Sequence, residues 1–293
     1  MTDRPTLAVI GGSGLYSMTG LSEIEEHDIE TPFGRPSDPV IVGSLSLPGG
    51  GKRRVAFLAR HGKGHRYLPG EINYRANIYA LKLLGVERIV AVSACGSLRE
   101  DYAPGHIVIP DQIFDNTKNR PRTFFGDGLV AHIGVADPLC PDLSAQLHDA
   151  VQATGAAVHR GGAFITVEGP RFSTKAESQT FRGWGMSLVG MTTSPEAFLA
   201  KEAEMCYACM AHVTDYDVWH VSEAPVTVDM VVRILNQNTA TAQQAIANLA
   251  GALKPQRDCT CEQTLSTAFL TARERIPAST IVRLGPIVGK YFG

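Results

Sequence analysis

The sequence predicts an α/β fold that forms a single domain. Short apolar runs alternate along the chain with longer segments whose apolar residues recur at helical spacing, which is the pattern of strands interleaved with helices. No period of roughly 20 to 50 residues repeats, so a solenoid is excluded. We expect one domain over residues 1–293, with residues 255–293 as a C-terminal extension packed on it.

The predicted strands share one property, because each apolar run ends in glycine or in polar residues. The runs are residues 7–10, 55–59, 89–92, 164–167, 188–189 and 205–213. In open α/β sheets, ligands bind outside the carboxyl ends of the strands, where the loops converge. The six strand ends are therefore expected to form one composite site.

Three segments are predicted to be helices: residues 71–84, about 194–204 and about 228–253. Gly85 ends the first helix, Ser194 and Pro195 are expected to cap the second, and Pro255 closes the third. Most of the apolar stripe on the third helix is expected in the core, while its first turn can line a ligand pocket.

The balance of charges argues against binding to nucleic acid or to a membrane surface. The 27 basic residues nearly match 29 acidic ones, which gives a net charge of −2. The first thirty residues lack a signal-peptide pattern, and no apolar stretch approaches the roughly 20 residues of a bilayer span. We expect a soluble, cytoplasmic protein.

The glycine-rich loop at residues 11–14 follows the first predicted strand and is expected to hold an anion. Its backbone amides and the Ser13 hydroxyl can approach a phosphate closely. A dinucleotide site is the rival interpretation, but Ser17 stands where the fingerprint requires a third glycine. Residues 23–28 also have the composition of a solvated loop, so NAD and FAD are disfavoured.

Arg60 and His61 lie at the end of a predicted strand and add further phosphate donors. The guanidinium fork suits two phosphate oxygens, and the imidazole can donate another hydrogen bond. A surface turn is the alternative for this pair, but Ser93 and Thr192 supply hydroxyl donors at two other strand ends. No nucleoside-triphosphate loop motif occurs, which favours inorganic phosphate.

Asp215 and Asp217 flank Tyr216 after the last predicted strand, and alternation turns both carboxylates to one side. A solvated turn is one interpretation. In a buried pocket, a carboxyl group that desolvation keeps neutral can instead donate a hydrogen bond at neutral pH. Raising its pKa from about 4 to about 7 costs about 4 kcal/mol of solvation, which indicates a functional proton.

The six cysteines are too few for a disulfide scaffold. Cys206 and Cys209 lie in an apolar run and are expected to act as small buried hydrophobes. Cys259 and Cys261 follow in a polar stretch, where they can form a disulfide, take part in redox exchange or be inert. A four-thiolate zinc site from both pairs matches no compact zinc spacing.

Ten motifs resemble those of the purine nucleoside phosphorylase and methylthioadenosine phosphorylase family. They are residues 11–15, 31–38, 59–65, 73–77, 94–100, 168–173, 191–193, 195–196, 200–203 and 214–217. The resemblance runs in order from about residue 6 to residue 235 and fades beyond residue 255. It implies a single α/β domain with a distorted central mixed sheet flanked by helices, assembled as a homotrimer or a dimer of trimers.

The resemblance also implies a role for each matching residue. Phosphate would be held by Ser13, Arg60, His61, Ser93, Ala94 and Thr192, and Met191 would lie against the ribose. The base would be bound by Phe172, Ser173, Asp215 and Asp217. The methylthio pocket would be formed by Val228, Val231 and, from a neighbouring subunit, His132.

The implied reaction is phosphorolysis of an adenine nucleoside, S-methyl-5'-thioadenosine, with Asp215 as the acid. Phosphate is a co-substrate, and neither a metal nor an organic cofactor is required. Relatives that act on 6-oxopurines are expected to carry Glu at Ser173 and Asn at Asp215, so the residues present favour adenine. Preference for adenosine or methylthioinosine is the first alternative, and a non-catalytic nucleoside or phosphate sensor is the second.

Overall fold

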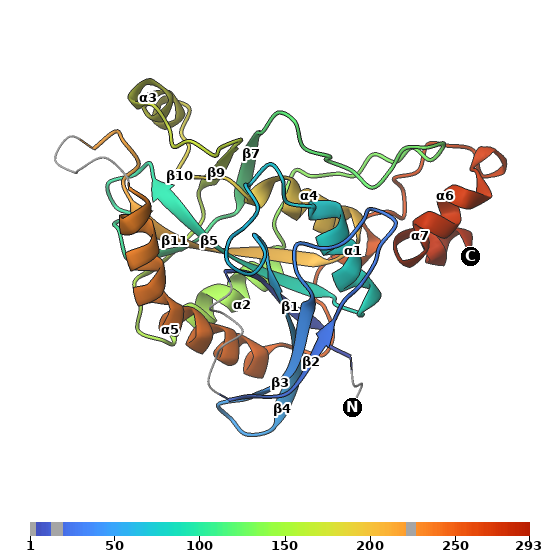
Figure 1. Ribbon diagram of the computed structural model, residues 1–293, viewed down its shortest axis with the longest axis horizontal. Coiled ribbons are helices and arrows are strands. Elements are labelled where there is room, and N and C mark those ends of the chain that lie inside the picture. The colour runs from blue at the N-terminus through green and yellow to red at the C-terminus, as the bar shows by residue number, and fades with distance from the viewer. Residues whose placement is uncertain (1–3, 13–19, 221–226) are drawn as a thin grey trace.

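The computed structural model describes residues 4–12, 20–220 and 227–293, apart from the side chains of residues 230, 231 and 233–237 (Figure 1). The strands are β1 (Leu7–Gly11), β2 (Leu21–His27), β3 (Val40–Ser46), β4 (Lys52–Ala59), β5 (Arg88–Ser97), β6 (Ile107–Ile109), β7 (Gln112–Asn116), β8 (Val158–Arg160), β9 (Ala163–Val167), β10 (Leu188–Gly190) and β11 (Cys206–Asp215). The helices are α1 (Tyr74–Leu83), α2 (Pro141–Gln152), α3 (Lys175–Gly183), α4 (Thr193–Glu202), α5 (Val228–Ala252), α6 (Ala278–Arg283) and α7 (Gly285–Phe292), with short 3-10 helices at Cys261–Gln263 and Arg273–Arg275.

The strands form one mixed sheet. Its main path runs β2-β3-β4-β1-β5-β10-β9-β7, while β11 pairs with β5 and β6, and β6 also pairs with β8. The central pairs β4–β1, β1–β5 and β5–β11 are parallel, whereas β2–β3, β3–β4, β5–β10 and β6–β11 are antiparallel. The predicted α/β fold with a mixed central sheet is therefore confirmed.

Helices cover both faces of the central strands. On one face, α2 and α5 share a buried apolar cluster with β1, β5 and β11, to which Leu143, Ile246 and Val90 belong. On the other face, α1 and α4 contribute residues such as Ile78 and Leu199 to a larger core. Figure 1 shows these two helix pairs on opposite sides of β5 and β11. Burial on both faces explains why the central strands read as continuous apolar runs.

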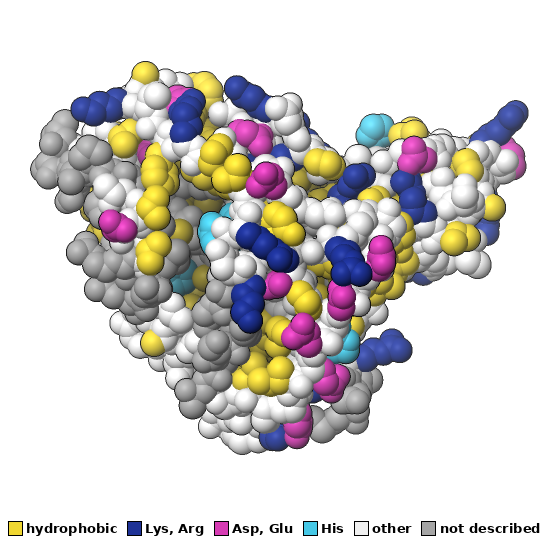
Figure 2. Space-filling view, in the orientation of Figure 1, with side chains coloured by type: hydrophobic (Ala, Val, Ile, Leu, Met, Phe, Trp, Pro, Cys, Tyr) yellow, Lys and Arg dark blue, Asp and Glu magenta, His cyan; other side chains and the backbone are white. Residues whose placement is uncertain are grey.

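Strand β5 changes its partner partway along one edge. It pairs with β1 through residues 88–91 and with β10 only through residues 96 and 97, while β11 follows its other edge. Among the described strands, none pairs with residues 92–95 on the first edge. The sheet divides at this point. Figure 2 shows a hollow in the surface between α5 and the centre of the molecule.

The six predicted strands are confirmed as β1, β4, β5, β9, β10 and β11, and the three predicted helices as α1, α4 and α5. The segment assigned to α4 is kinked at Ser194, which has extended angles of φ −103° and ψ 137° after the first cap residue, Thr192. The expected cap is therefore present in the backbone, with Ser194 before the helix that continues from Pro195, but the Ser194 hydroxyl makes no hydrogen bond with the described residues. The following Pro195 explains the extended angles of Ser194, because proline disfavours the helical region for the residue before it.

Residues 23–28 were expected to be a solvated loop, and this expectation is wrong for most of the segment. They belong to β2, an edge strand that pairs antiparallel with β3. The strand is exposed, and its Glu23 and Glu25 carboxylates pair with Lys52 and Arg54 on β4. Charged side chains are common on sheet edges, because they oppose pairing with another chain. In β2 they also remove the apolar run by which the other strands were predicted.

The C-terminal extension is packed on the rest of the chain. Leu265, Leu284, Ile287 and Val288 are fully buried in the core that includes α1 and α4. The extension carries α6 and α7, which lie at the opposite end of the molecule from the start of α5 (Figure 1). Within the described part of the chain, no helix has the length and apolar character needed to cross a membrane.

Candidate active site

The unpaired stretch of β5 contains two of the expected phosphate residues, Ser93 and Ala94. Ser93 is buried, and its hydroxyl has no hydrogen-bond partner among the described residues. A buried hydroxyl without a partner costs free energy unless a ligand or water completes it. The division of the sheet therefore leaves a polar opening in which an anion can be bound.

Arg60 faces this opening from the end of β4, and its side chain is fully buried. Its Nε and Nη2 atoms donate to the two carboxylate oxygens of Glu196 at 2.7 and 2.8 Å. Nη1 donates to the carbonyl of Val92 at 3.1 Å, and Nη2 also contacts the carbonyl of Ile10 at 3.3 Å. The guanidinium thus ties α4 to the end of β1 and the middle of β5.

The expectation that the Arg60 fork grips two phosphate oxygens is therefore wrong. The Glu196 carboxylate occupies that fork and neutralises its charge. Tyr207 holds the same carboxylate with a 2.9 Å hydrogen bond from its hydroxyl, which fixes the pair further. One hydrogen on Nη1 has no described acceptor, so Arg60 can offer an anion a single donor.

The imidazole of His61 was expected to donate a hydrogen bond to phosphate, but its one donor is used within the protein. Its Nδ1 lies 2.8 Å from the carbonyl of Tyr67, and because a carbonyl only accepts, Nδ1 carries a proton. Burial, with a smaller contribution from the charge of Arg60, lowers the pKa of His61 to about 4, although the hydrogen bond to Tyr67 raises it. At neutral pH the ring is uncharged and its Nε2 is an acceptor. It can therefore accept a hydrogen bond from a protonated phosphate oxygen.

Thr192 is the N-cap of α4, whose first turn is interrupted by the extended Ser194, and the Ser194 amide donates to the Thr166 hydroxyl at 3.2 Å. The Thr192 side chain makes no capping bond, and the buried hydroxyls of Thr193 and Ser194 have no partner among the described residues. Helix N-termini attract anions through their free amides and their dipole. The first turn of α4 is thus a second group of donors near the opening in the sheet.

Asp215 ends β11 opposite Gly96, where the pairing with β5 shifts by one residue. The carboxyl group is buried: its Oδ2 accepts from the Thr214 hydroxyl at 2.6 Å and its Oδ1 from the amide of Asp217 at 2.7 Å. Burial raises the pKa of Asp215 to about 6, against these hydrogen bonds, which lower it. The group is therefore able to exchange a proton close to neutral pH.

The same geometry accommodates Asp215 when it is protonated. The Thr214 hydroxyl has one hydrogen and two acceptors, Asp215 Oδ2 at 2.6 Å and the carbonyl of Cys95 at 3.2 Å. When Oδ2 carries a proton, Thr214 can turn its own hydrogen to Cys95 and accept from Asp215. Thr214 is a positioning residue that the sequence analysis did not identify.

Asp217 lies beside Asp215 in a strained backbone conformation, with φ at +52°. The side chain is buried, and its Oδ2 has no hydrogen-bond partner among the described residues. Burial raises the pKa of Asp217, while the nearby hydroxyls of Ser178 and Ser173 lower it. This structure thus brings Ser173 and both aspartates together and leaves one carboxylate oxygen that an amine can satisfy.

Gly96 is required where these aspartates approach β5. A Cβ at this position would lie 2.9 Å from Asp215 Oδ1 and 3.2 Å from the Asp217 Cβ. Real Cβ atoms essentially never show a contact of 2.9 Å, and 3.2 Å is tight, so any side chain would displace the Asp215 carboxylate. The glycine of the 94–100 motif therefore serves the position of the acid.

Met191 and Phe172 lie on the loops that follow β10 and β9. Met191 packs over Gly169, where an added Cβ would lie 2.6 Å from its sulfur. Phe172 is 39% exposed, which is unusual for a large apolar side chain on a polar loop. The two loops therefore meet at Met191 and Gly169, and the Phe172 ring is partly exposed on the loop after β9.

A sequence profile of the Phosphorylase superfamily matches residues 6–254. The chain belongs to this superfamily. The S-methyl-5'-thioadenosine phosphorylase of Geobacter sulfurreducens is 54% identical over 286 residues, which cover 97% of this chain and 98% of that protein. The enzyme of the same name from Chloroflexus aurantiacus is 52% identical over 288 residues, with 98% of both chains covered.

Solved structures give the same result. A methylthioadenosine phosphorylase from an antarctic soil metagenomic library superimposes with a TM-score of 0.91 at 44% identity, covering 98% of this chain and 99% of that one. A variant of the Schistosoma mansoni adenosine/methylthioadenosine phosphorylase in complex with methylthioadenosine gives a TM-score of 0.77 at 34% identity, covering 86% and 93%. The resemblance found in the sequence is confirmed.

Within this superfamily fold, Arg120 is a central residue that the sequence analysis missed. Its buried guanidinium donates to the backbone carbonyls of Glu168 at 2.8 Å, Met191 at 2.7 Å and Ser194 at 2.8 Å. It also binds the Glu168 carboxylate at 3.1 Å. Arg120 thereby fixes the loops after β9 and β10 and the start of α4 relative to one another.

The residues expected to form the methylthio pocket do not lie together within one chain. Val228 begins α5 and is 64% exposed, while Ser13 and the side chain of Val231 lie outside the described residues. His132 is exposed, and its backbone amide donates to the carbonyl of Ala268 in the C-terminal extension at 2.9 Å. Figure 1 places this extension at the opposite end of the molecule from the start of α5.

Proposed function

We propose that this chain catalyses the phosphorolysis of S-methyl-5'-thioadenosine to adenine and 5-methylthioribose 1-phosphate, a purine and methionine salvage reaction. The observation that carries the proposal is the buried pair Asp215 and Asp217, of which one has a pKa near 6 and the other an unsatisfied oxygen. Relatives of that name at about half identity over nearly the whole chain support it.

In this reaction an oxygen of phosphate attacks C1' of the ribose while the bond from C1' to N9 breaks. The electron pair of that bond goes to the purine, and Asp215 donates its proton to N7. Adenine then leaves as a neutral base. General acid catalysis of this kind contributes roughly 10²–10⁴-fold, and the positioning of phosphate supplies further rate.

The remaining roles are proposed from the resemblance, and the described side chains support part of them. Asp217 Oδ2 would accept a hydrogen bond from the exocyclic amine of adenine, which hypoxanthine lacks. Phosphate would be bound by Ser13, Arg60, His61, Ser93, Ala94 and Thr192, with Arg60 giving one donor and neutral His61 accepting a hydrogen bond from a phosphate O–H group. Met191 and Phe172 would contact the ribose and the base. We propose that the reaction uses no metal and no organic cofactor.

We also propose that the active form is a homotrimer, or a dimer of trimers, in the cytoplasm. His132 lies on the C-terminal side of the molecule, away from Val228 of its own chain. If both line the methylthio pocket, they must come from neighbouring subunits. Sedimentation of the native protein tests the assembly, and a His132→Ala variant that raises KM for methylthioadenosine but not for adenosine tests the contact.

A substrate panel tests the chemistry. Methylthioadenosine, adenosine and inosine are each incubated with the protein, with and without phosphate, and the released base is measured. We expect adenine release from methylthioadenosine that requires phosphate, with inosine several orders of magnitude slower. A faster reaction with adenosine would assign the alternative substrate, and binding without base release would indicate a sensor.

A further inference from the structure

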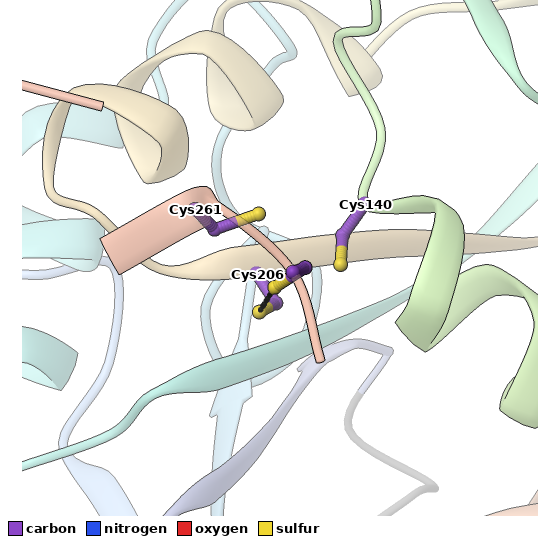
Figure 3. A group of neighbouring side chains, drawn as sticks. Cys140, Cys206 and Cys261 are labelled. Carbon is purple, nitrogen blue, oxygen red and sulfur yellow. Dashed lines mark hydrogen bonds between the residues drawn. The ribbon is translucent and has the colours of Figure 1, made fainter. Parts of the chain in front are cut away.

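Four cysteines from three distant parts of the sequence meet away from the candidate active site. Cys140 is the N-cap of α2, Cys206 begins β11, and Cys259 and Cys261 lie in the C-terminal extension. Their sulfur atoms all lie within 4.8 Å of one another. Figure 3 shows Cys140, Cys206 and Cys261 turned toward a common point.

The expected role of each cysteine changes with this arrangement. Cys206 was expected to be only a small buried hydrophobe, but its sulfur lies 3.3 Å from that of Cys259. Cys209 is buried elsewhere on β11 and does not join the cluster. Cys140 takes its place, although it lies far from the other three in sequence. The sequence argued against a four-thiolate site because the spacing of the two close cysteine pairs matches no compact zinc pattern. That argument fails because the cluster contains Cys140 in place of Cys209.

The distances suit a tetrahedral metal ion better than bonded sulfurs. A disulfide requires sulfurs about 2.05 Å apart, whereas Cys206 and Cys259 are separated by 3.3 Å. Zinc binds thiolates at about 2.3 Å, which places tetrahedral sulfurs about 3.8 Å from one another. The observed cluster needs shifts of only about an ångström to reach that geometry.

A positively charged side chain lies beside the cluster, as a site with excess negative charge requires. One divalent ion with four thiolates carries a net double negative charge. The Arg257 guanidinium faces the Cys206 sulfur and is held there by the Glu204 carbonyl at 3.0 Å and the Glu262 carboxylate at 2.7 Å. The backbone amide of Leu143 donates to Cys140 Sγ at 3.4 Å, which is the kind of outer contact that orients a metal ligand.

We propose that Cys140, Cys206, Cys259 and Cys261 bind one zinc ion that fastens the C-terminal extension to the α/β domain. Binding converts four thiols to thiolates and releases their protons to solvent. The site is structural, because all four positions of the tetrahedron are filled by protein. It is also distant from catalysis, since Cys206 and Asp215 begin and end β11, a separation of about 30 Å.

The metal would hold a segment that matters for assembly. Cys259 and Cys261 precede Ala268, whose carbonyl binds the amide of His132. The same extension buries Leu284 and Ile287 in the domain core. Zinc would thus fix the part of the molecule on which His132 is mounted.

Metal analysis of the native protein, prepared with reductant and without chelator, tests the site. We expect about one zinc ion per chain, lost in Cys261→Ser and kept in Cys209→Ala. Cys209 is the matched control because it lies on β11 but outside the cluster. Titration of the zinc-free protein with Co²⁺ should give the intense visible bands of a tetrahedral tetrathiolate site. This test uses the wild-type protein and so does not depend on whether a variant folds.

Either of two results with the wild-type protein would overturn the proposal, and a third result, with the variants, would contradict its ligand assignment. One is wild-type protein that binds neither zinc nor Co²⁺ under reducing conditions. The other is an intact mass showing that the four cluster thiols are oxidised to two disulfides in the native protein, with no metal present. Equal zinc content in Cys261→Ser and Cys209→Ala would also contradict the assignment of these ligands.

Discussion

Replacing Asp215 with asparagine removes the proton that we assign to the leaving base while keeping the shape of the side chain. Asparagine can still accept from the amide of Asp217 and can donate to the Thr214 hydroxyl, whose hydrogen then turns to the carbonyl of Cys95. The fold should therefore be preserved. We expect kcat/KM for methylthioadenosine to fall by roughly 10²–10⁴-fold, the contribution of a general acid.

The pKa of Asp215 also predicts how kcat/KM changes with pH. With a pKa of about 6, Asp215 is protonated in roughly one molecule in ten at pH 7. Since the acid form is active, kcat/KM of the wild type should fall about tenfold for each pH unit above 6. The Asp215→Asn variant has no such proton and should lose this limb. Initial rates of adenine release across pH 5–9, at fixed phosphate ionisation or corrected for it, measure both quantities.

Stability provides an independent measure of the same group. The folded pKa of Asp215 lies above the unfolded value of 3.8, so its ionisation destabilises the folded state above pH 6. The shift corresponds to at most about 3 kcal/mol. In urea unfolding, Asp215→Asn should be more stable than the wild type at pH 7.5, and the difference should vanish as pH falls to 4. Activity within threefold of the wild type, or a variant that is less stable at both pH values, would refute the reasoning.

Three further predictions concern neighbouring groups. Glu196→Gln leaves the buried Arg60 charge unpaired, so the unfolding free energy should fall by about 3–5 kcal/mol in urea; a loss under 1 kcal/mol would contradict the role of the pair. His61 should titrate near pH 4 by imidazole NMR, and because its unfolded pKa is 6.5, its contribution to stability is lost as pH falls from 6.5 to 4. Phosphate should raise that midpoint, and an unchanged value would remove His61 from the phosphate site. Gly96→Ala should reduce kcat/KM for methylthioadenosine at least tenfold with unchanged circular dichroism, because its Cβ displaces Asp215, and normal kinetics would count against this packing.

The sequence predicts the central strands and the positions of the site residues well, for one physical reason. Strands buried on both faces must be continuous apolar runs, and their ends are where polar residues first become possible. Thr192 and Asp215 follow this pattern, whereas Ser93 lies within β5, which continues to Ser97. The edge strand β2 was missed because solvent faces it, so its charged side chains carry no strand pattern.

What the sequence could not predict depends on pairs of residues that meet only after folding. Arg60 was correctly placed at a strand end, but its partner Glu196 lies 136 positions away and decides how the guanidinium is used. Arg120 shows no local signal beyond a short basic stretch, yet it joins three loops. Cys140 likewise joins a cluster that no spacing rule reveals.

The central claim is that phosphate, not water, cleaves the nucleoside bond. Following the reaction of methylthioadenosine by ³¹P NMR tests this claim most directly. The account predicts that inorganic phosphate is converted to a sugar 1-phosphate in equal amount to the adenine released, and that no adenine forms when phosphate is absent. Adenine release that proceeds without phosphate and yields the free sugar would contradict it.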